Sequence, residues 1–178
     1  SQHNERHAIV KTWYFTEDAY PYLPDADSYE SIRVNLPNRN YDPARGADLY
    51  HMYLDLWLQA EASGLEIMLN EHHQTATCVV PAAPLMLSIL ARQSKTARLL
   101  ILGNPLANRN QPVRVAEEAA LLDNLMNGRL ECGIGAGIGP FSFVAYNVPW
   151  DQKREMTLEA LQIIKGIWTH ETFSFEGK

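Results

Sequence analysis

The chain has 178 residues, of which 15 are Lys or Arg and 21 are Asp or Glu, so its formal net charge is −6. Four Trp, eight Tyr and five Phe exclude a disordered tail, because so many aromatic side chains require a core. The phosphate backbone repels a net acidic chain without a cluster of Lys and Arg, and no apolar run approaches the ~20 residues that span a bilayer. Neither nucleic acid nor a membrane is therefore an expected partner.

The two cysteines and the first six residues indicate the cellular compartment in which we expect the protein. Cys78 and Cys132 are too few for a disulfide scaffold and are typical of a protein in a reducing compartment. Residues 1–6 contain no apolar segment of the kind that begins a secreted chain. We therefore expect a cytoplasmic protein, long enough for one domain with a sizeable core.

A strand followed by a helix is predicted four times in chain order. Apolar and β-branched runs predict the strands, and apolar residues at three- and four-residue spacing predict the helices. The predicted strands are 7–14, 65–69, 98–102 and 129–134, and the predicted helices are 47–63, 84–94, 112–127 and 152–169. Residues 17–46 lack a helical period, and the alternation in 173–175 predicts a short surface strand. Gly64 is placed to end the first helix, because glycine accepts the left-handed conformation.

The spacing of these elements indicates a parallel sheet. The last three predicted strands begin roughly 30 residues apart, about the size of one βαβ unit. A doubly wound sheet would bind a dinucleotide through Gly-x-Gly-x-x-Gly at the start of a helix. Here Ile138 or Pro140 falls where that motif needs its last glycine, and Pro140 is expected to keep a helix from starting directly. We therefore predict an α/β (β/α)8 TIM barrel, of which this chain supplies about the first four strand–helix units.

Four units are half of such a barrel, which needs about 250 residues. A half would leave two parallel edges and the inward faces of its strands uncovered. The residues assigned to those inward faces are Leu65, Ile67, Leu100 and Leu102. We therefore expect residues 1–178 to be the N-terminal portion of a single barrel domain without its C-terminal half, or a half that must pair.

His72 and His73 follow the second predicted strand, where barrels place their functional residues. Neighbours in an extended segment point to opposite sides, so one is expected to face the barrel mouth and the other to pack sideways. A neutral imidazole at the mouth can donate a hydrogen bond or shuttle a proton near pH 7. Two histidines hydrogen-bonded within a loop are the alternative. The other histidines, His3, His7, His51 and His170, lie near the termini or in predicted helices, so a metal site is not expected.

Other residues have both a chemical and a structural interpretation. Glu117 and Glu118 suggest acid–base work, but adjacent helix positions do not face each other, and Glu118 can pair with Arg114. Cys132 lies mid-strand and is predicted to be a small buried hydrophobe, and Cys78 would be reactive only with a lowered pKa. The glycines of 135–139 permit close approach of a flat or anionic ligand, or form only a tight turn.

Several motifs occur in a fixed order along the chain. They are Asn-Glu-His-His-Gln-Thr at 70–75, Leu-Gly-Asn-Pro at 102–105, Pro-Val-Arg-Val-Ala-Glu-Glu at 112–118, Leu-Asp at 122–123 and Gly-Arg-Leu at 128–130. Together they resemble the bacterial-luciferase-like flavin-dependent monooxygenases, the LLM class of oxidoreductases. The resemblance runs from about Ile9 to Gly177.

This resemblance implies an oxidoreductase whose barrel mouth holds reduced FMN, usually supplied by a separate flavin reductase. Oxygen, the co-substrate, adds to the flavin, and the peroxide then oxidises a small organic substrate. The first histidine of Glu-His-His, His72, is then the catalytic one. The segment after the third strand, which often contains an unusual cis peptide, lies against the isoalloxazine ring. We therefore expect a cofactor-binding set of Asn70, Glu71, Gly103, Asn104 and Gly135.

One departure from the family pattern and two alternatives remain. Bacterial luciferase has Cys-Arg after the fourth strand, with the Arg reaching the phosphate, whereas this chain has Gly135-Ala136. The phosphate is therefore expected to bind elsewhere.

The alternatives are a deazaflavin-dependent oxidoreductase on the same barrel, which moves hydride without oxygen, and a non-catalytic partner subunit. A homo-oligomer is also expected.

Overall fold

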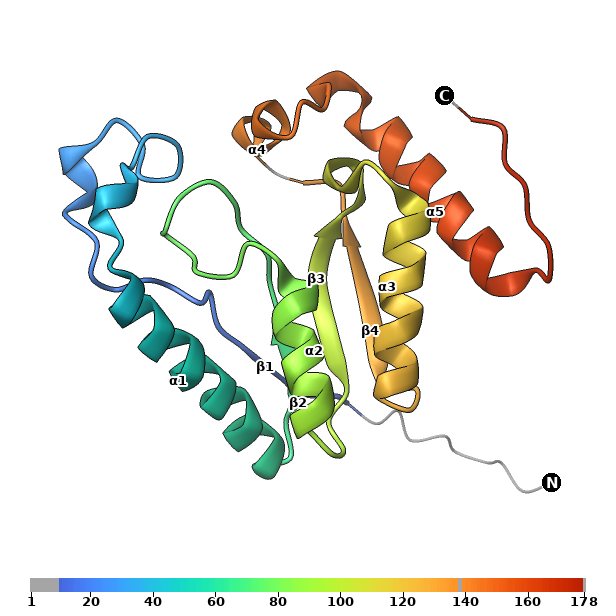
Figure 1. Cartoon of the computed structure of the whole chain (residues 1–178), viewed down its shortest axis with the longest axis horizontal. Helices are drawn as coiled ribbons and strands as arrows, with labels where there is room; N and C mark the ends of the chain where they lie inside the picture. The colour runs from blue at the N-terminus through green and yellow to red at the C-terminus, as the bar shows by residue number, and fades with distance from the viewer. Residues whose placement is uncertain (1–9, 138, 178) are drawn as a thin grey trace.

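Four parallel strands form one sheet in the computed structural model, which describes residues 10–137 and 139–177. The strands are β1 (Trp13–Phe15), β2 (Glu66–Leu69), β3 (Leu99–Pro105) and β4 (Leu130–Gly135). Each strand pairs in parallel with the next one along the chain, in the order β1-β2-β3-β4. The predicted parallel sheet is therefore confirmed, and the carboxyl ends of all four strands lie at the same edge (Figure 1).

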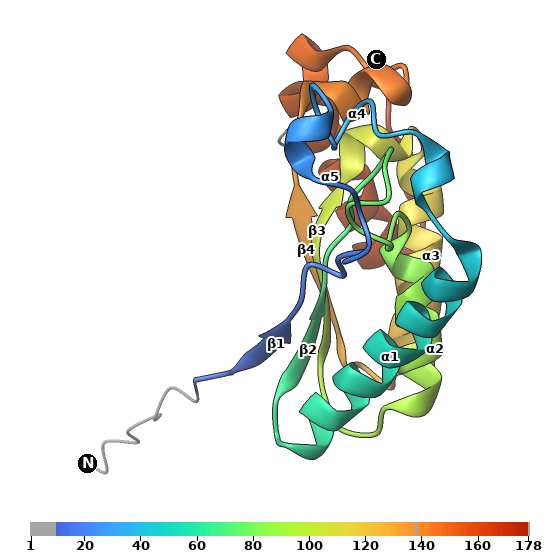
Figure 2. The ribbon, with the colours of Figure 1, turned by 90° about the vertical axis from the view of Figure 1, so that its left-hand side faces the viewer.

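The connections between the strands are helical. The helices are α1 (Pro43–Ala62), α2 (Ala83–Gln93), α3 (Pro112–Leu125), α4 (Pro140–Ala145) and α5 (Lys153–Thr169). Figure 2 shows α1, α2 and α3 on one side of the sheet, and α5 packs against α3. Helix α1 begins earlier than predicted because Asp42 caps it, with Oδ1 accepting a hydrogen bond from the N–H of Ala44 at 2.9 Å. Gly64, with a φ of 80°, ends it as expected.

The core lies between the sheet and these helices. Ile67 and Leu69 of β2 pair in register with Leu99 and Ile101 of β3, so all four side chains point to the same side. All four are buried against the helices, where Trp57 of α1 is fully buried with them. The assignment of Ile67 to the inward face of a barrel is therefore wrong. A strand that is apolar on both faces does not reveal from its sequence which face meets the helices.

The opposite side of the sheet has no helix over it in the part of the chain that the structure describes (Figure 2). Phe15, Met68 and Leu100 lie side by side on this face through the strand register. Leu102 follows two residues along β3, as the sequence predicts, and is 48% exposed. We call these four residues the open sheet face. Leu65, the remaining residue assigned there, precedes β2 and is half-buried.

Two expectations about the C-terminal third are wrong. Helix α4 starts at Pro140 directly after Gly139, because proline fits the first turn of a helix, where its missing N–H is not needed. Residues 173–175 form no strand. The ring of Phe173 instead lies 5.8 Å from the ring of His170, centroid to centroid, and packs over Gly166 of α5.

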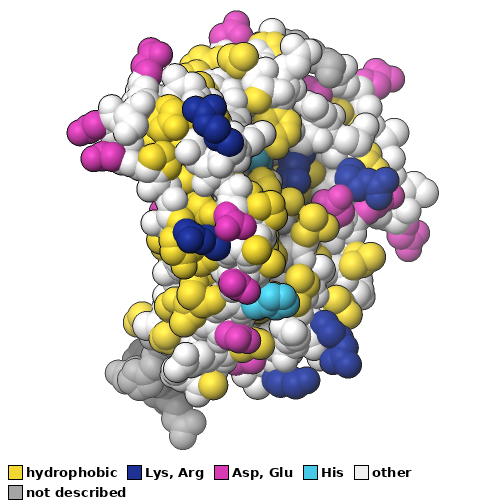
Figure 3. All heavy atoms as spheres, turned by 60° about the vertical axis from the view of Figure 1, so that its left-hand side comes forward, with side chains coloured by type: hydrophobic (Ala, Val, Ile, Leu, Met, Phe, Trp, Pro, Cys, Tyr) yellow, Lys and Arg dark blue, Asp and Glu magenta, His cyan; other side chains and the backbone are white. Residues whose placement is uncertain are grey.

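The distribution of charged side chains on the surface can be compared with the partners expected from the sequence. Lys and Arg side chains on the face drawn in Figure 3 are scattered among acidic and hydrophobic ones. No helix in the described part of the chain combines the length and the apolar character needed to cross a bilayer.

Candidate active site

A pocket of about 570 Å³ lies at the carboxyl ends of the strands. Its lining comes from the ends of β3 and β4, from the segments that follow the four strands and from the start of α4. The residues predicted as functional that line it are Asn70, Glu71, His72, Gly103 and Gly135. Asn104 instead lines a second, smaller cavity. The parallel topology thus brings most of the predicted residues together, because strand ends distant in sequence meet at one edge.

His72 is half-buried in this pocket. Its Nδ1 lies 3.7 Å from Oε2 of Glu17, and its backbone N–H donates a hydrogen bond to the carbonyl of Val80 at 3.2 Å. Burial lowers the pKa of His72 below its ordinary value of 6.5, although the charge of Glu17 opposes this shift. The imidazole is therefore neutral at pH 7.

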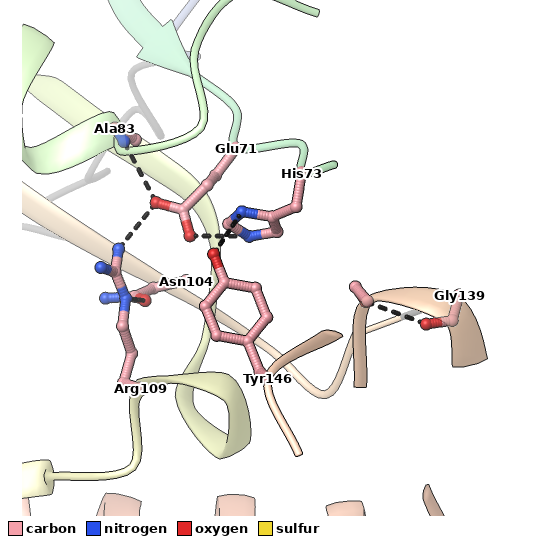
Figure 4. Close-up of polar contacts among 8 residues, drawn as sticks. Glu71, His73, Ala83, Asn104, Arg109, Gly139 and Tyr146 are labelled. Atoms are coloured by element: carbon pink, nitrogen blue, oxygen red, sulfur yellow. Dashed lines mark hydrogen bonds and ion pairs between the residues drawn. The ribbon is translucent and has the colours of Figure 1, made fainter. Parts of the chain in front are cut away.

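His73 also lines the pocket, so the expectation that one histidine would pack sideways is wrong. The two rings nevertheless have different neighbours. His73 Nε2 lies 3.1 Å from Oε1 of Glu71, and His73 Nδ1 lies 2.9 Å from the hydroxyl of Tyr146 (Figure 4). Both ring nitrogens of His73 thus face a protein group, whereas His72 has a single distant carboxylate.

The Glu71 side chain is only 1% exposed. Its Oε2 accepts hydrogen bonds from Nη2 of Arg109 at 2.7 Å and from the backbone N–H of Ala83 at 3.1 Å. Arg109 Nε in turn donates to Oδ1 of Asn104 at 2.9 Å. Figure 4 shows the carboxylate between these groups and His73. A buried carboxylate requires such partners, because an unpaired charge is costly away from water.

Several polar atoms of the pocket are buried without a hydrogen-bond partner in the described chain. They are Asn70 Oδ1, Asn108 Oδ1, His72 Nδ1 and His73 Nε2, the last of which lies near Glu71 but makes no hydrogen bond with it. The amide of Asn70 is engaged only through Nδ2, which donates to Glu17 at 3.2 Å. A buried polar atom without a partner costs free energy, so a ligand with a polar edge would be stabilised here.

The glycines of the site allow the backbone to approach closely. A Cβ on Gly103 would lie 3.3 Å from the backbone nitrogen of Gly135. The peptide between Leu102 and Gly103 is cis, within the segment where the resemblance implies such a bond. Gly137 has a φ of 72°, and a Cβ there would lie 2.6 Å from the ring of Phe143. The backbones of Gly103 and Gly135, both of which line the pocket, thus approach each other closely at these strand ends.

The other residues considered for a chemical role do not line this pocket. Arg114 pairs with Glu117 at 3.2 Å on the surface of α3, and not with Glu118 as expected. Burial raises the pKa of the Cys78 thiol to about 11, so the thiol is protonated and unreactive near pH 7. Cys132 of β4 is exposed, contrary to prediction. The described residues include no group of three or more His, Cys, Asp or Glu that could hold a metal ion.

Sequence reasoning missed several residues of the site, among them Glu17, the neighbour of His72. Arg33 and Asn108 line the pocket, and Arg109 and Tyr146 hold Glu71 and His73. Their positions in a long loop, in a turn after β3 and at the end of α4 have no regular spacing. The one available signal is that residues 106–109 directly follow a strand end, where barrels place functional residues.

Comparison with known sequences decides the family. A family model described as "Luciferase-like monooxygenase" matches residues 32–178. The chain belongs to this family. Among curated relatives in bacteria, the FMNH(2)-dependent dimethylsulfone monooxygenase of Pseudomonas putida is 29% identical over 122 residues, which cover 66% of this chain and 34% of the relative. The oxygenase component of the flavin-dependent trigonelline monooxygenase of Acinetobacter baylyi is 31% identical over 125 residues, covering 67% and 34%. The chain therefore spans about a third of the length of these curated relatives.

Solved structures agree on the fold. The oxygenating constituent of 3,6-diketocamphane monooxygenase from Pseudomonas putida, solved with FMN, has a TM-score of 0.69 at 22% identity and covers 94% of this chain and 41% of that chain. A monooxygenase from Streptomyces bottropensis has a TM-score of 0.70 at 22% identity and covers 83% and 44%. These likenesses confirm the luciferase-like TIM-barrel fold class, with this chain supplying about the first four strand–helix units.

Proposed function

We propose that this chain forms part of a flavin-dependent monooxygenase that uses reduced FMN and O2 to oxidise a small organic substrate. The observation that carries the proposal is the pocket at the strand ends of a luciferase-like family member, where His72, Gly103 and Gly135 meet. The names of the curated relatives support FMN as the cofactor. That a flavin peroxide is the species that oxidises the substrate stays a prediction.

The residues of the pocket fit FMN. Its flat ring system would lie against Gly103 and Gly135, where no side chain keeps a planar ligand away. The buried oxygens of Asn70 and Asn108 would face its polar edge and gain the partners that they lack. When bound and reduced, FMN supplies the electrons for the activation of O2 and the oxidation of the substrate.

His72 would hold and move a proton in this pocket. Its neutral imidazole carries one proton, and the carboxylate of Glu17, 3.7 Å from Nδ1, favours that proton on Nδ1. Nε2 is then free to accept a proton from a reacting group and to return it. His73 is less suited to this role, because both of its ring nitrogens face Glu71 or Tyr146.

Further proposals concern the rest of the protein. We expect residues 1–178 to be the N-terminal portion of one barrel domain, and other residues than Gly135-Ala136 to hold the FMN phosphate. The term oxygenase component in the name of one relative supports a separate flavin reductase as partner. Exposed apolar side chains on α2 and α3, such as Leu85 and Leu121, support a homo-oligomer. The free state of Cys78 and Cys132 supports a cytoplasmic location.

The test uses the whole protein that carries this chain. FMN is titrated into it while flavin fluorescence is followed, and oxygen uptake is measured with NADH and a flavin reductase over a panel of small organic sulfur compounds and ketones. Tight FMN binding with substrate-dependent oxygen uptake is the expected result. Reduction by a deazaflavin without oxygen uptake would identify the hydride-transferring alternative. A folded protein that retains no flavin would identify a partner subunit.

A further inference from the structure

Glu71 connects more elements of this fold than its place in the Glu-His-His motif suggests. Its carboxylate accepts hydrogen bonds from the backbone N–H of Ala83, the first residue of α2, and from the guanidinium of Arg109. Its Oε1 lies 3.1 Å from Nε2 of His73. Oε2 thus accepts two hydrogen bonds, whereas Oε1 contacts the His73 ring without a hydrogen bond (Figure 4). A carboxylate that is 1% exposed and occupied in this way has little left to offer a ligand.

One branch of contacts runs from Glu71 to the wall at the end of β3. Arg109 lies in the turn that follows β3 and donates one hydrogen bond to Glu71 and another to Asn104. Asn104 directly follows Gly103, which lines the pocket, while Asn104 itself does not. Arg109 therefore ties the Asn104 side chain, and with it the segment 102–105, to Glu71.

A second branch runs from Glu71 to α4. His73 lies between the Glu71 carboxylate and the hydroxyl of Tyr146, which directly follows α4. The rings of His73 and Tyr146 also pack edge to face, with centroids 5.0 Å apart. Phe141 at the other end of α4 lines the pocket, and its carbonyl accepts a hydrogen bond from Gln74 at 3.1 Å. His73 and Gln74 thus contact both ends of α4.

We propose that Glu71 is a positioning residue that sets two walls of the pocket, and not a ligand of the cofactor. Through Arg109 and Asn104 it places the Gly103 wall, against which FMN would lie. Through His73 and Tyr146 it places α4. The part of the inference that concerns FMN rests on the proposed function, whereas the placement of the two walls does not.

The two branches make different predictions, which hydrogen exchange of the ligand-free whole protein separates. Asn104→Ala removes the acceptor of the first branch, so backbone amides of 102–104 should exchange at least ~10-fold faster while those of 141–146 stay unchanged. Tyr146→Phe removes only the hydroxyl of the second branch and should have the reverse effect. Glu71→Gln should accelerate exchange in both segments and leave α1 unchanged. Glu117→Gln, which alters an exposed ion pair on α3, is the matched control and should change none of these segments.

Titration with oxidised FMN then tests the consequence for the cofactor. Asn104→Ala and Glu71→Gln should each raise the Kd for FMN about 10-fold, which corresponds to ~1.4 kcal/mol. The Glu71→Gln/Asn104→Ala double variant should bind no more weakly than the weaker single variant, because both changes release the same wall. Tyr146→Phe should leave this Kd within about twofold.

The outcomes distinguish this inference from the proposed function. Unchanged exchange in 102–104 and 141–146 of Glu71→Gln overturns the inference, whatever FMN does. Additive losses of FMN affinity in the double variant overturn it too, since they indicate that Glu71 contacts the ligand independently. A wild-type protein that binds no FMN refutes the proposed function, while the exchange data still decide whether Glu71 sets the two walls.

Discussion

The ring nitrogens of His72 have fewer protein neighbours than those of His73, and this difference leads to a prediction about single residues. His72→Ala should lower turnover by ~100-fold or more, the size of a general acid–base effect, because the proton-carrying group is lost. FMN affinity should change little. Steady-state oxygen uptake and flavin titration of the whole protein measure the two quantities. His51→Ala, on the exposed surface of α1, is the control, and a His72→Ala variant that turns over at the wild-type rate would refute the assignment.

Asp18 leads to a second prediction for a single residue, because its carboxyl is fully buried and has no hydrogen-bond partner in the described chain. Burial, and secondarily the charge of Glu17, raise the pKa of Asp18 from 3.8 to about 7. The folded state therefore binds a proton that the unfolded state releases, and the free energy of unfolding should fall as the pH rises through this interval.

The Asp18→Asn variant removes this titration without changing the shape of the side chain. The backbone at residue 18 has a φ of 52°, which Asn tolerates well. We expect the variant to be more stable than the wild type at pH 8 and to lose less stability between pH 4 and pH 7. Urea unfolding at several pH values measures this. Identical pH profiles of the two proteins would mean that Asp18 does not titrate in this interval.

Glu61 joins two elements and leads to a prediction at that scale. From the last turn of α1, its Oε1 accepts hydrogen bonds from the N–H groups of Lys95, Thr96 and Ala97, at 2.8, 2.7 and 2.8 Å. Partial burial raises the pKa of Glu61, but the three backbone hydrogen bonds outweigh it and leave the pKa below 4.5. A carboxyl with a lowered pKa stabilises the fold above its unfolded pKa, and this contribution is lost as the pH falls.

Glu61→Gln should therefore weaken the attachment of α1 to the turn before β3. We expect the free energy of unfolding at pH 7 to fall by about 1–2 kcal/mol, since the hydrogen bonds lose their charged acceptor. The difference from the wild type should shrink below the ordinary pKa of 4.5. Glu117→Gln provides the control, because an exposed pair contributes at most about 1 kcal/mol. A pH-independent difference would show that charge is not the cause.

For the whole molecule, the sequence predicts most of the fold. Parallel strands with intervening helices leave a period that can be read along the chain, and Gly64 marks the end of α1 by its backbone requirement alone. The orientation of β2 was not predictable, because Ile67 and Met68 are both apolar and only the helices decide which one is buried. The sequence does not predict helix α4, because Pro140 suggests a barrier to a helix, although proline is accommodated at a first turn.

Some residues of the site can likewise be predicted from the sequence, and others cannot. His72, Gly103 and Gly135 each stand at a strand end, so the parallel topology alone predicts that they meet. Arg109 reaches Glu71 from a turn that follows β3, and Tyr146 reaches His73 from the end of α4. Such partners are far apart in the sequence and are selected by packing, so no local pattern identifies them.

The open sheet face leads to the last prediction, for the chain of 178 residues purified alone. Phe15 is 41% and Leu102 48% exposed there, beside the half-buried Met68 and Leu100. Each large apolar side chain left in water forfeits roughly 1.5–3 kcal/mol of stabilisation, and several such losses rival the ~5–15 kcal/mol stability of a domain. We therefore expect this chain to self-associate through the open sheet face. It should also bind FMN weakly, because Gly135-Ala136 offers the phosphate no cation.

Sedimentation velocity over a range of concentrations and FMN fluorescence titration test this prediction. Phe15→Ser should reduce self-association, because it replaces an exposed ring of the open sheet face by a small polar group. Val144→Ser is the matched control, since Val144 is 79% exposed on α4, away from that face. A monodisperse monomer that binds FMN at low micromolar concentration would contradict the prediction. It would also mean that the open sheet face is stable in water without a covering layer.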